Sequence, residues 1–305
     1  MRVLVQLPEG LKPKAPEIVR ELEEKGYEVI LSASPMYGGC DIAYEEAKAV
    51  GAQKIIHVGH SYFPLKRTFE DIEVEYIPYH IDIEIGWPEL VKELKSKNIK
   101  TLSVLTTVQH IHQFPQIKEY FEKEGFEVKV RKGPFCTYEG QVLGCDAYGI
   151  HPEAEAAVII ADGDFHHTAA THIAHKMPVY GVNPYTKAFS QVNEKLIRLL
   201  KRRRGSLLKA LEAQHFGILV STKPGQWGFK LALEIKKKLE ARGKKAYILV
   251  GNELFPDSLY NYLFIEVYIN TACPRIVDDV EKYKKPIINP DQLQEFFTLL
   301  GQDTQ

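Results

Sequence analysis

Residues 123–128, Lys-Glu-Gly-Phe-Glu-Val, repeat residues 24–29, Glu-Lys-Gly-Tyr-Glu-Val, almost residue for residue. In each copy an amphipathic helical pattern precedes the glycine, and the stretch that follows it leads into a predicted strand or loop. A glycine directly after the last periodic residue is typical of a helix C-terminus. The two copies lie about one hundred residues apart in a chain of 305. This self-similarity predicts that the chain is built from repeats of one structural unit.

The pattern of apolar residues predicts strands and helices in the same alternation along the chain. Short continuous apolar runs predict strands, and apolar residues three or four positions apart predict helices. The predicted strands are residues 2–7, 28–32, 54–58, 74–77, 102–106, 156–161, 179–182, 216–220, 247–250, 267–270 and 286–288. The predicted helices lie around residues 18–25, 45–50, 115–123, 190–213 and 229–239.

Strands that are apolar on both faces and alternate with amphipathic helices are typical of parallel sheets covered by helices. We therefore predict an α/β protein of three homologous Rossmann-like repeats with parallel sheets. The predicted boundaries lie near residues 97 and 190. The first repeat then covers residues 1–97 and the second residues 98–190, while residues 191–305 form a linker helix and the third repeat.

The composition is that of an ordinary globular protein, with 45% hydrophobic and 26% charged residues. A formal net charge of −1 gives no overall attraction to nucleic acid or membrane. The chain has no apolar run of about 18 residues, which a spanning helix would need. The strand predicted at residues 2–7 leaves no room for a signal peptide, and four scattered cysteines fit a reducing compartment. We therefore expect a cytoplasmic protein.

One cysteine in each repeat follows a predicted strand. Gly39, Cys40 and Asp41 recur as Gly-Cys-Asp at residues 144–146, around Cys145, and Cys273 lies in the third repeat. Cys40 and Cys145 follow the second strand of their repeats, and Cys273 follows the third strand of its own. Parallel α/β sheets bind ligands outside the carboxyl ends of their strands. We therefore expect the fold to bring these three thiols to one point.

Three thiolates can hold a tetrahedral site with one open position. Zinc is one candidate for such a site and an iron–sulfur cluster is the other. A single cysteine in an α/β protein is more often a small buried hydrophobic residue. The repeated Gly-Cys-Asp and the position after a strand favour a ligand role for Cys40, Cys145 and Cys273. Cys136 has no counterpart in the other repeats, and we assign it to packing.

Several histidines are weaker candidates for a site. His166 follows Asp164 at a strand end, which is a plausible place to face a ligand. His57 and His60 flank the third strand end of the first repeat, where a site role and a structural role are about equally favoured. The residues His110 and His112 fit a polar loop better.

Two further segments have both a structural and a functional interpretation. Residues 221–228 follow the first strand of the third repeat, as a phosphate loop would, but they lack its Gly-Lys-Ser/Thr ending. Lys223 and Gln226 could hold a carboxylate or a ribose there, and a plain connecting turn is equally favoured. The basic run at residues 201–204 fits a solvated helix face better than a docking site for an acidic or RNA-bound partner.

Five short motifs together resemble the archaeal-type diphthamide synthase family, which performs the first step of diphthamide formation. They are Gly-Gly-Cys-Asp at 38–41, Val-Gly-His-Ser at 58–61, Leu-Gly-Cys-Asp at 143–146, Gly-Asp-Phe-His at 163–166 and Thr-Ala-Cys-Pro-Arg-Ile at 271–276. The resemblance covers essentially the whole chain. It implies three homologous α/β domains in a pseudo-threefold arrangement around one [4Fe-4S] cluster, with Cys40, Cys145 and Cys273 as its ligands.

The resemblance also implies an activity and its partners. In this family the 3-amino-3-carboxypropyl group of S-adenosylmethionine is transferred as a radical to the imidazole C2 of a histidine in elongation factor 2. The Cγ–S bond of the sulfonium is the one that breaks. An electron donor and a homodimer are implied, and neither membrane nor direct nucleic-acid binding is expected. The residues expected to contact S-adenosylmethionine are Gly59, His60, Asp164, His166, Gln226 and Arg275.

Two alternatives remain from the sequence. Quinolinate synthase also joins three α/β repeats through one cysteine each around a cluster with an open iron, but uses the cluster as a Lewis acid for a dehydration. The local motifs resemble diphthamide synthase more closely. The non-enzymatic alternative is a small-molecule-binding protein of Rossmann-like repeats with structural cysteines. A brown, anaerobically purified sample would exclude that alternative.

Overall fold

The computed structural model describes residues 1–68 and 71–302, and its strands form three separate sheets. The chain divides into two compact units, Met1–Ile197 and Arg198–Gln305. The first unit contains two of the sheets and the second unit contains the third. None of the described helices is both long enough and apolar enough to cross a membrane.

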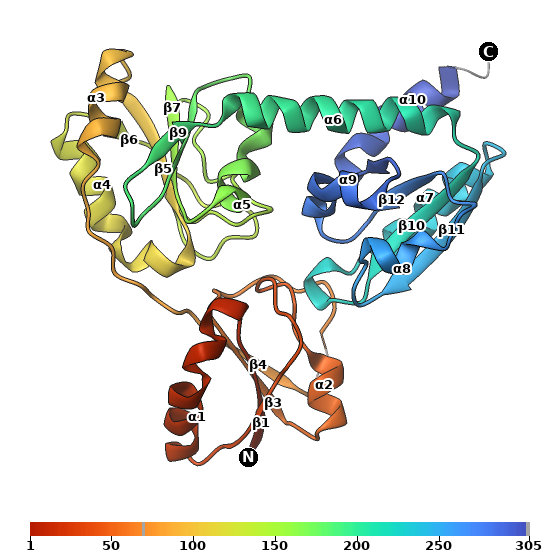
Figure 1. The fold of residues 1–305 in the computed structure, drawn as a ribbon, viewed down its shortest axis with the longest axis horizontal. Helices are drawn as coiled ribbons and strands as arrows, with labels where there is room; N and C mark the ends of the chain where they lie inside the picture. Colours follow the sequence, from red (N-terminus) through yellow and green to blue (C-terminus); the bar gives the residue numbers. More distant parts are fainter. Residues whose placement is uncertain (69–70, 303–305) are drawn as a thin grey trace. The chain divides into compact units, whose positions relative to one another are not determined.

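The first sheet is fully parallel, with strand order β2-β1-β3-β4. Its strands are β1 (Arg2–Gln6), β2 (Glu28–Leu31), β3 (Lys54–Val58) and β4 (Glu73–Ile77). A 3-10 turn, η1 (Glu9–Lys14), precedes α1 (Ala15–Glu24), and α2 (Tyr44–Ala49) follows β2. Alternate residues of β1 face opposite sides, so Val3 and Val5 pack with Leu22 of α1 while Leu4 packs with Ala47 of α2. The two helices therefore cover opposite faces of the sheet (Figure 1).

The second sheet has the order β6-β5-β7-β8-β9 and is parallel except for its last strand. Its strands are β5 (Thr101–Thr106), β6 (Glu127–Val128), β7 (Ala156–Ile160), β8 (Val179–Val182) and β9 (Phe189–Gln191). The helices α3 (Pro88–Ser96) and α4 (Phe114–Lys123) pack on one face, where Leu90 and Phe121 join a core with Val104 and Val158. The shorter η2 (Val108–Gln113), α5 (Asp164–His167) and η3 (Thr168–Ile173) follow the ends of β5 and β7.

The antiparallel strand β9 corrects the predicted helix at residues 190–213. The side chain of Asn183 accepts hydrogen bonds from the backbone N–H groups of Tyr185 and Thr186, which turns the chain back along β8. Ser190 then pairs with Gly181 as a strand residue. The helix α6 (Asn193–Glu212) begins only at Asn193.

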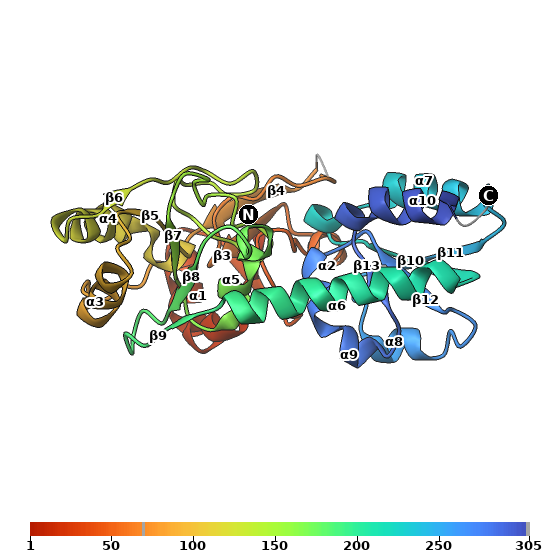
Figure 2. The same cartoon turned by 90° about the horizontal axis from the view of Figure 1, so that it is seen from above.

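The third sheet is parallel, with order β11-β10-β12-β13. Its strands are β10 (His215–Ser221), β11 (Lys245–Gly251), β12 (Val267–Asn270) and β13 (Ile287–Ile288). Figure 2 shows α7 (Phe229–Glu240) and α10 (Leu293–Gln302) on one side of it, and α8 (Pro256–Tyr260) and α9 (Val280–Tyr283) on the other. The short turns η4 (Pro224–Gln226), η5 (Pro274–Asp279) and η6 (Pro290–Gln292) follow strand ends.

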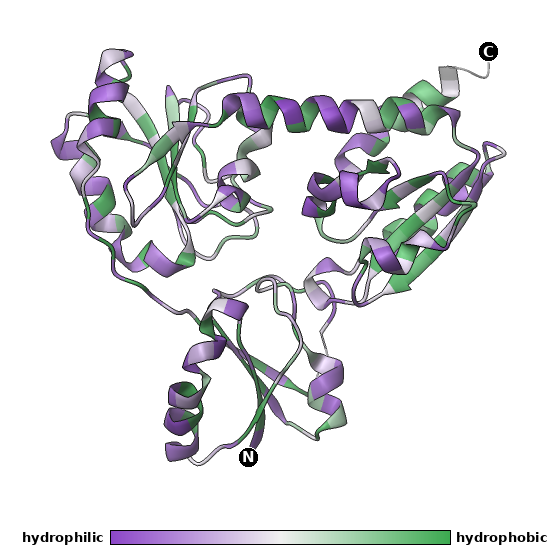
Figure 3. Cartoon of the chain, viewed as in Figure 1, coloured by the Kyte–Doolittle hydropathy of each residue, from purple (hydrophilic) through white to green (hydrophobic). Residues whose placement is uncertain are grey.

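The three α/β repeats and the parallel character of the sheets are confirmed. The boundaries at residues 97 and 190 stay predictions, and residue 190 lies within β9. The strands are largely hydrophobic, while hydrophobic and hydrophilic residues alternate along helices such as α6 (Figure 3). The sequence pattern did not predict α3, α5, α8, α9, α10 or the short strand β6. For α3 the signal was present, because Pro88 stands in its first turn and Leu90, Val91 and Leu94 have helical spacing.

Candidate functional site

The three cysteines expected at the site are all half-buried and lie on loops beyond strand ends. Cys40 follows β2 and Cys145 lies on the long connection from β6 to β7, both in the unit Met1–Ile197. Cys273 follows β12 in the unit Arg198–Gln305. The fourth cysteine, Cys136, is buried, which agrees with its assignment to packing.

The Cys40 loop packs directly against the loop that follows β3. An ideal Cβ on Gly39 would lie 3.0 Å from the carbonyl oxygen of Ser61 and 3.1 Å from Cβ of Phe63, so a side chain at Gly39 would force one of the two loops to shift. The hydroxyl of Tyr76 donates a hydrogen bond of 2.9 Å to the Gly39 carbonyl. The glycine therefore allows the close approach, and the tyrosine fixes it.

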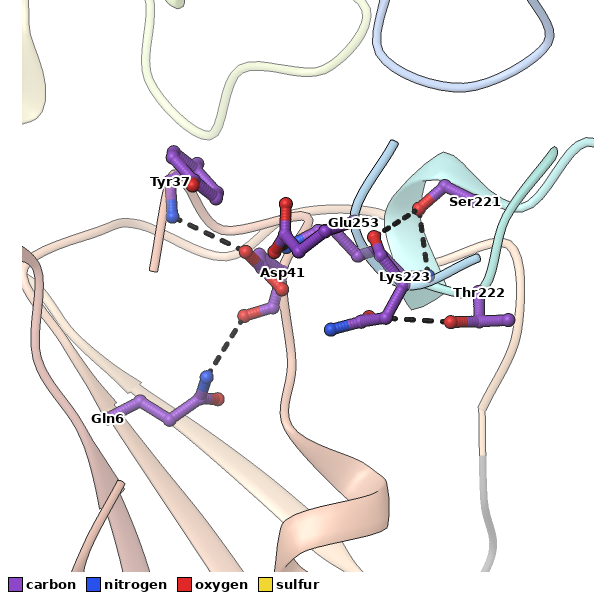
Figure 4. Close-up of polar contacts among 8 residues, drawn as sticks. Gln6, Tyr37, Asp41, Ser221, Thr222, Lys223 and Glu253 are labelled. Carbon is purple, nitrogen blue, oxygen red and sulfur yellow. Dashed lines mark hydrogen bonds and ion pairs between the residues drawn. The ribbon is translucent and has the colours of Figure 1, made fainter. Parts of the chain in front are cut away.

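Asp41 and Gln6 organise the chain on the other side of Cys40. The backbone N–H of Tyr37 donates to a carboxylate oxygen of Asp41 at 3.4 Å, and Nε2 of Gln6 donates to the Asp41 carbonyl at 3.3 Å (Figure 4). Gln6 also accepts from the backbone N–H of Ala43 at 3.0 Å. Gln6 is the last residue of β1, so the loop is attached to a strand in the centre of the sheet.

A histidine pair lies at the carboxyl end of β3. The ring nitrogens Nε2 of His57 and Nδ1 of His60 share a hydrogen bond of 3.0 Å. Burial lowers the pKa of His60 to about 4 and lowers the pKa of His57 well below its usual value. Between them Gly59 has φ +101°, a conformation that favours glycine. Both imidazoles are therefore neutral at neutral pH.

The first two repeats meet next to these loops. Nε2 of Gln141, on the Cys145 loop, donates a 2.7 Å hydrogen bond to the hydroxyl of Ser61. The rings of Phe63 and Phe135 are stacked with centroids 5.6 Å apart. Since Ser61 also borders Gly39, a continuous set of contacts joins the Cys40 loop to the Cys145 loop.

The Cys145 loop is folded around the carboxylate of Asp146. This residue is fully buried and accepts hydrogen bonds from the backbone N–H groups of Phe135 at 2.7 Å and Tyr148 at 2.9 Å. The thiol of Cys136 donates to the same carboxylate at 3.5 Å. Burial, followed by the Asp146 charge, raises the pKa of Cys136, which keeps this cysteine a neutral thiol.

The segment that contains Asp164 and His166 lies against the Cys145 loop. An ideal Cβ on Gly144 would lie 2.0 Å from the ring of Phe165, so the ring occupies the space that a side chain would take. Asp164 forms an ion pair with Lys195, and the hydrogen bond from this lysine lowers the pKa of Asp164. The glycine of Gly-Cys-Asp thus allows a neighbouring strand-end loop to approach, as Gly39 does in the first repeat.

Cys273 is held by a buried amide instead of a carboxylate. Nδ2 of Asn270, at the end of β12, donates to the Cys273 carbonyl at 2.7 Å, and its Oδ1 accepts from the backbone N–H of Ala272 at 3.0 Å. An ideal Cβ on Gly228 would lie 2.4 Å from the carbonyl oxygen of Thr271. The loop at residues 221–228 therefore packs against the Cys273 loop.

Two ion pairs border this third loop. Nζ of Lys223, whose side chain is 5% exposed, lies 2.7 Å from a carboxylate oxygen of Glu253. The hydroxyl of Ser221 accepts from the backbone N–H of Lys223 at 3.1 Å, which fixes the turn after β10 (Figure 4). Nε of Arg275 lies 2.5 Å from Asp278. Burial raises the pKa of Cys273, and the nearby Arg275 acts in the opposite direction.

Comparison with known proteins identifies the family. Residues 7–305 match the model of the family described as "Putative diphthamide synthesis protein". The chain belongs to this family. It is 37% identical to the 2-(3-amino-3-carboxypropyl)histidine synthase of Pyrococcus horikoshii, over 96% of this chain and 84% of that protein. It is 28% identical to subunit 1 of the human 2-(3-amino-3-carboxypropyl)histidine synthase, over 95% of this chain and 66% of that protein.

Solved structures agree with this assignment to the diphthamide synthesis family. The crystal structure of Dph2 from Pyrococcus horikoshii has a TM-score of 0.84 and 35% identity, over 98% of this chain and 86% of that chain. A second crystal structure of the same protein, with a 4Fe-4S cluster, has a TM-score of 0.85 and 36% identity over the same shares. The match favours the diphthamide synthase interpretation over the quinolinate synthase and binding-protein alternatives.

Each predicted contact residue lies on a cysteine loop or on the loop beside one. Gly59 and His60 are on the loop packed against Cys40, and Asp164 and His166 are on the segment packed against the Cys145 loop. Gln226 is on the loop packed against the Cys273 loop, and Arg275 follows that cysteine directly. Within either unit, the described residues form no group of three or more His, Cys, Asp or Glu side chains that could hold a metal ion.

The remaining candidates have structural partners. Both histidines lie in the 3-10 turn η2 and not in a loop. Nδ1 of the buried His110 shares a 2.8 Å hydrogen bond with the Ile81 carbonyl, and His112 lies 2.7 Å from Asp82. The arginines of the basic run pair with acidic residues of their own unit: Arg202 with Glu281, Arg203 with Asp291 and Arg204 with Glu295.

Sequence reasoning missed the roles of Asp146, Asn270 and the Ser61–Gln141 hydrogen bond. The first two stand next to or near a cysteine in motifs that were singled out, but no local pattern shows that their side chains are buried.

Proposed function

We propose that the chain catalyses the first step of diphthamide formation by transferring the 3-amino-3-carboxypropyl group of S-adenosylmethionine to a histidine of elongation factor 2. The family and the names of the relatives support this reaction. The observation that carries the proposal is the arrangement common to all three repeats. In each one, a half-buried cysteine lies on a loop beyond a strand end, and a glycine contact packs this loop against a second segment that follows a strand end; in the second repeat that segment is α5.

The cluster proposed for this reaction is a [4Fe-4S] cluster held by Cys40, Cys145 and Cys273. The donor set fits, because thiolates are the usual ligands of such clusters and these three are half-buried and lie on loops. Three ligands for four irons leave one iron for the substrate. When bound and reduced, such a cluster supplies the electron that cleaves a carbon–sulfur bond of S-adenosylmethionine. The structural relative with a 4Fe-4S cluster supports this choice over zinc.

The surrounding residues would bind and orient S-adenosylmethionine. We assign Gly59, His60, Asp164, His166, Gln226 and Arg275 to its contacts. His60 is a neutral imidazole at neutral pH, so it would place no positive charge near the sulfonium. The carboxylate of Asp164 suits the methionyl ammonium group, and the guanidinium of Arg275 suits its carboxylate.

The bond proposed to break is Cγ–S, so that 5′-methylthioadenosine leaves and the aminocarboxypropyl group is transferred. The three cysteines are supplied by separate repeats instead of one short loop, so the surroundings of S-adenosylmethionine are built differently from those in the common radical enzymes. Incubation of dithionite-reduced enzyme with S-adenosylmethionine and elongation factor 2 should give 5′-methylthioadenosine as the main nucleoside. A dominant yield of 5′-deoxyadenosine, or turnover without a reductant, would overturn this step.

The proposed partners are elongation factor 2 as substrate, a one-electron donor and a second copy of the chain, in the cytoplasm. The edge strand β11 supports the homodimer, because an edge strand offers unpaired backbone groups. Exposed hydrophobic residues accompany it: Val250 lies on the strand and is 55% exposed, and Phe264, 48% exposed, packs against Tyr247 of the strand. Light scattering at micromolar concentration should give twice the monomer mass.

The cysteine assignment is tested by measuring iron and sulfide after anaerobic reconstitution. The variants Cys40→Ala, Cys145→Ala and Cys273→Ala should each lose most of the cluster, because each removes one ligand. Cys136→Ala is the matched control and should retain it, since Cys136 is buried against Asp146. Retention in Cys145→Ala, or loss in Cys136→Ala, would contradict the assignment.

A further inference from the structure

Phe165 lies beside a cysteine loop, and the proposed function gives it no role. It belongs to α5 and stands between Asp164 and His166, which are both proposed contacts of S-adenosylmethionine. Its side chain is 51% exposed, and it lies beyond the carboxyl end of β7, the edge at which parallel α/β sheets bind ligands. A single exposed apolar residue is common on protein surfaces, so this exposure becomes informative only beside its counterpart in the first repeat.

The first repeat has a phenylalanine at the equivalent position. Phe63 follows the last residue of β3 by five positions, as Phe165 follows the last residue of β7 by five. Each lies against the glycine that precedes a proposed cluster ligand, Phe63 against Gly39 and Phe165 against Gly144. However, Phe63 is only 7% exposed, because its ring is stacked on that of Phe135. The glycine contact is therefore compatible with a buried ring, and the second repeat leaves its ring exposed.

The ring of Phe165 rests on Gly144 by one edge. The three ring atoms nearest to an ideal Cβ on Gly144 are Cδ1, Cε1 and Cζ, which are consecutive along one side of the ring. The ring of His166 is nearly perpendicular to it, at 85°, with centroids 5.3 Å apart. Gly144 directly precedes Cys145. A half-exposed aromatic ring therefore lies next to a residue that is proposed to hold the cluster.

The sulfonium is the part of S-adenosylmethionine that must lie closest to the proposed cluster, because its Cγ–S bond is the one proposed to break. The adenine is farther from the reacting bond, since the ribose separates it from the sulfur. The two carboxylates of these segments are already engaged. Asp146 is buried and accepts hydrogen bonds within its own loop, and Asp164 pairs with Lys195. An aromatic ring attracts a cation through the negative charge on its face, so Phe165 suits the sulfonium.

We propose that the ring of Phe165 binds the sulfonium of S-adenosylmethionine through a cation–π contact. This inference rests on the proposed function, because it takes S-adenosylmethionine as the ligand of this site. The equivalent position of the third repeat, five residues beyond the end of β12, is Arg275, which is also a proposed contact. Phe165 would then give the site its preference for S-adenosylmethionine over S-adenosylhomocysteine, which has a neutral thioether sulfur in place of the sulfonium.

The test measures the affinities of both compounds for the anaerobically reconstituted enzyme by calorimetry, without a reductant, so that no turnover occurs. Phe165→Leu keeps an apolar contact with Gly144 but removes the aromatic face. Its affinity for S-adenosylmethionine should fall roughly five- to tenfold, while that for S-adenosylhomocysteine stays within about twofold. Phe165→Tyr keeps the ring and should retain both affinities. The matched control is Tyr185→Leu, which should also retain both, since Tyr185 is likewise 51% exposed but lies after β8, beside His110.

The ratio of the two affinities separates this contact from other effects. Both compounds are measured on one preparation, so a partial loss of cluster or of folded protein lowers both affinities and leaves their ratio unchanged. The parent ratio in Phe165→Leu would overturn the proposal, whether both affinities fall, as for a ring stacked on adenine, or neither does. A parent enzyme that binds no S-adenosylmethionine would overturn the proposed function as well. A parent that binds it and releases 5′-methylthioadenosine, with an unchanged ratio in Phe165→Leu, would overturn the sulfonium contact alone.

Discussion

Asp146 connects the second cysteine loop to the protein through its buried carboxylate. It accepts hydrogen bonds from two backbone N–H groups and from the thiol of Cys136. Asparagine at this position would place a side-chain NH₂ group, a donor, against the N–H and S–H donors that now bind the carboxylate. We expect Asp146→Asn to lower the free energy of unfolding by about 2 kcal/mol, measured by denaturant titration of the iron-free chain. Asp162→Asn is the control, because Asp162 is exposed, and it should change stability by less than about 0.5 kcal/mol. Equal effects would contradict this role.

The His57–His60 pair predicts a dependence of stability on acid. Burial lowers the pKa of His60 to about 4, whereas the unfolded imidazole has a pKa of about 6.5. Between these two pH values the imidazole of His60 is protonated in the unfolded chain but neutral in the folded chain. The folded state therefore has its full stability at neutral pH, and its free energy of unfolding falls as the pH drops from about 6.5 towards 4.

The variant His60→Asn tests this dependence. The loss of stability between pH 7 and pH 5 should be smaller in the variant than in the parent by about 1–2 kcal/mol, since one protonation step is removed. The measurement is the unfolding midpoint at both pH values. An unchanged difference between parent and variant would show that the acid sensitivity arises elsewhere.

At the scale of elements, glycines set how closely the loops beside each cysteine approach. An ideal Cβ on Gly228 meets the backbone carbonyl of Thr271 at 2.4 Å, and a backbone atom cannot move without its loop. An ideal Cβ on Gly144 meets the ring of Phe165, which is 51% exposed and can swing away. We therefore expect Gly228→Ala to destabilise the protein by about 2 kcal/mol and Gly144→Ala by clearly less. Melting temperatures of the two variants would decide, and the reverse order would contradict the argument.

The part of α6 that belongs to Arg198–Gln305 is attached to this unit by three arginine ion pairs of different burial. The side chain of Arg203 is 16% exposed and that of Arg204 is 46% exposed. Exposed pairs contribute about 0–1 kcal/mol because water and salt screen them. Removing the more buried side chain of an ion pair lowers the free energy of unfolding by more than removing an exposed one. We expect Arg203→Gln to lower stability more than Arg204→Gln, and the gap should persist in 0.5 M salt. Equal losses that vanish in salt would show that both pairs are ordinary surface pairs.

At the scale of the whole molecule, the two units have hydrophobic cores of their own. Phe121 of α4 belongs to a core of Met1–Ile197, and Phe296 of α10 belongs to a core of Arg198–Gln305, and both are fully buried. Calorimetry of the iron-free chain should therefore resolve more than one unfolding transition. Phe121→Ala and Phe296→Ala should each cost about 3–5 kcal/mol and lower different transitions. A single transition that both variants lower equally would contradict independent cores.

The sequence by itself determined the repeats, the parallel sheets and the strand-end cysteines. These features are encoded locally: residues 156–160 are apolar along both faces, and Gly26 and Gly125 end helices through positive φ angles. A strand buried on both faces needs a helix on each side, so the local pattern also fixes the class of fold. The motifs around Cys40, Cys145 and Cys273 were enough to indicate the family.

The tertiary structure alone decided which side chains hold the cysteine loops and which charges are satisfied. Asp146 belongs to the repeated Gly-Cys-Asp motif, but its structural role depends on the backbone N–H groups of Phe135 and Tyr148, which only the folded loop brings to its carboxylate. The arginines of α6 were predicted to be a solvated face because their acidic partners lie about eighty to ninety residues away in the sequence. The strand β9 likewise exists because β8 offers it an edge. Each of these is a contact between residues distant in sequence, and such contacts are set by packing, which no local pattern encodes.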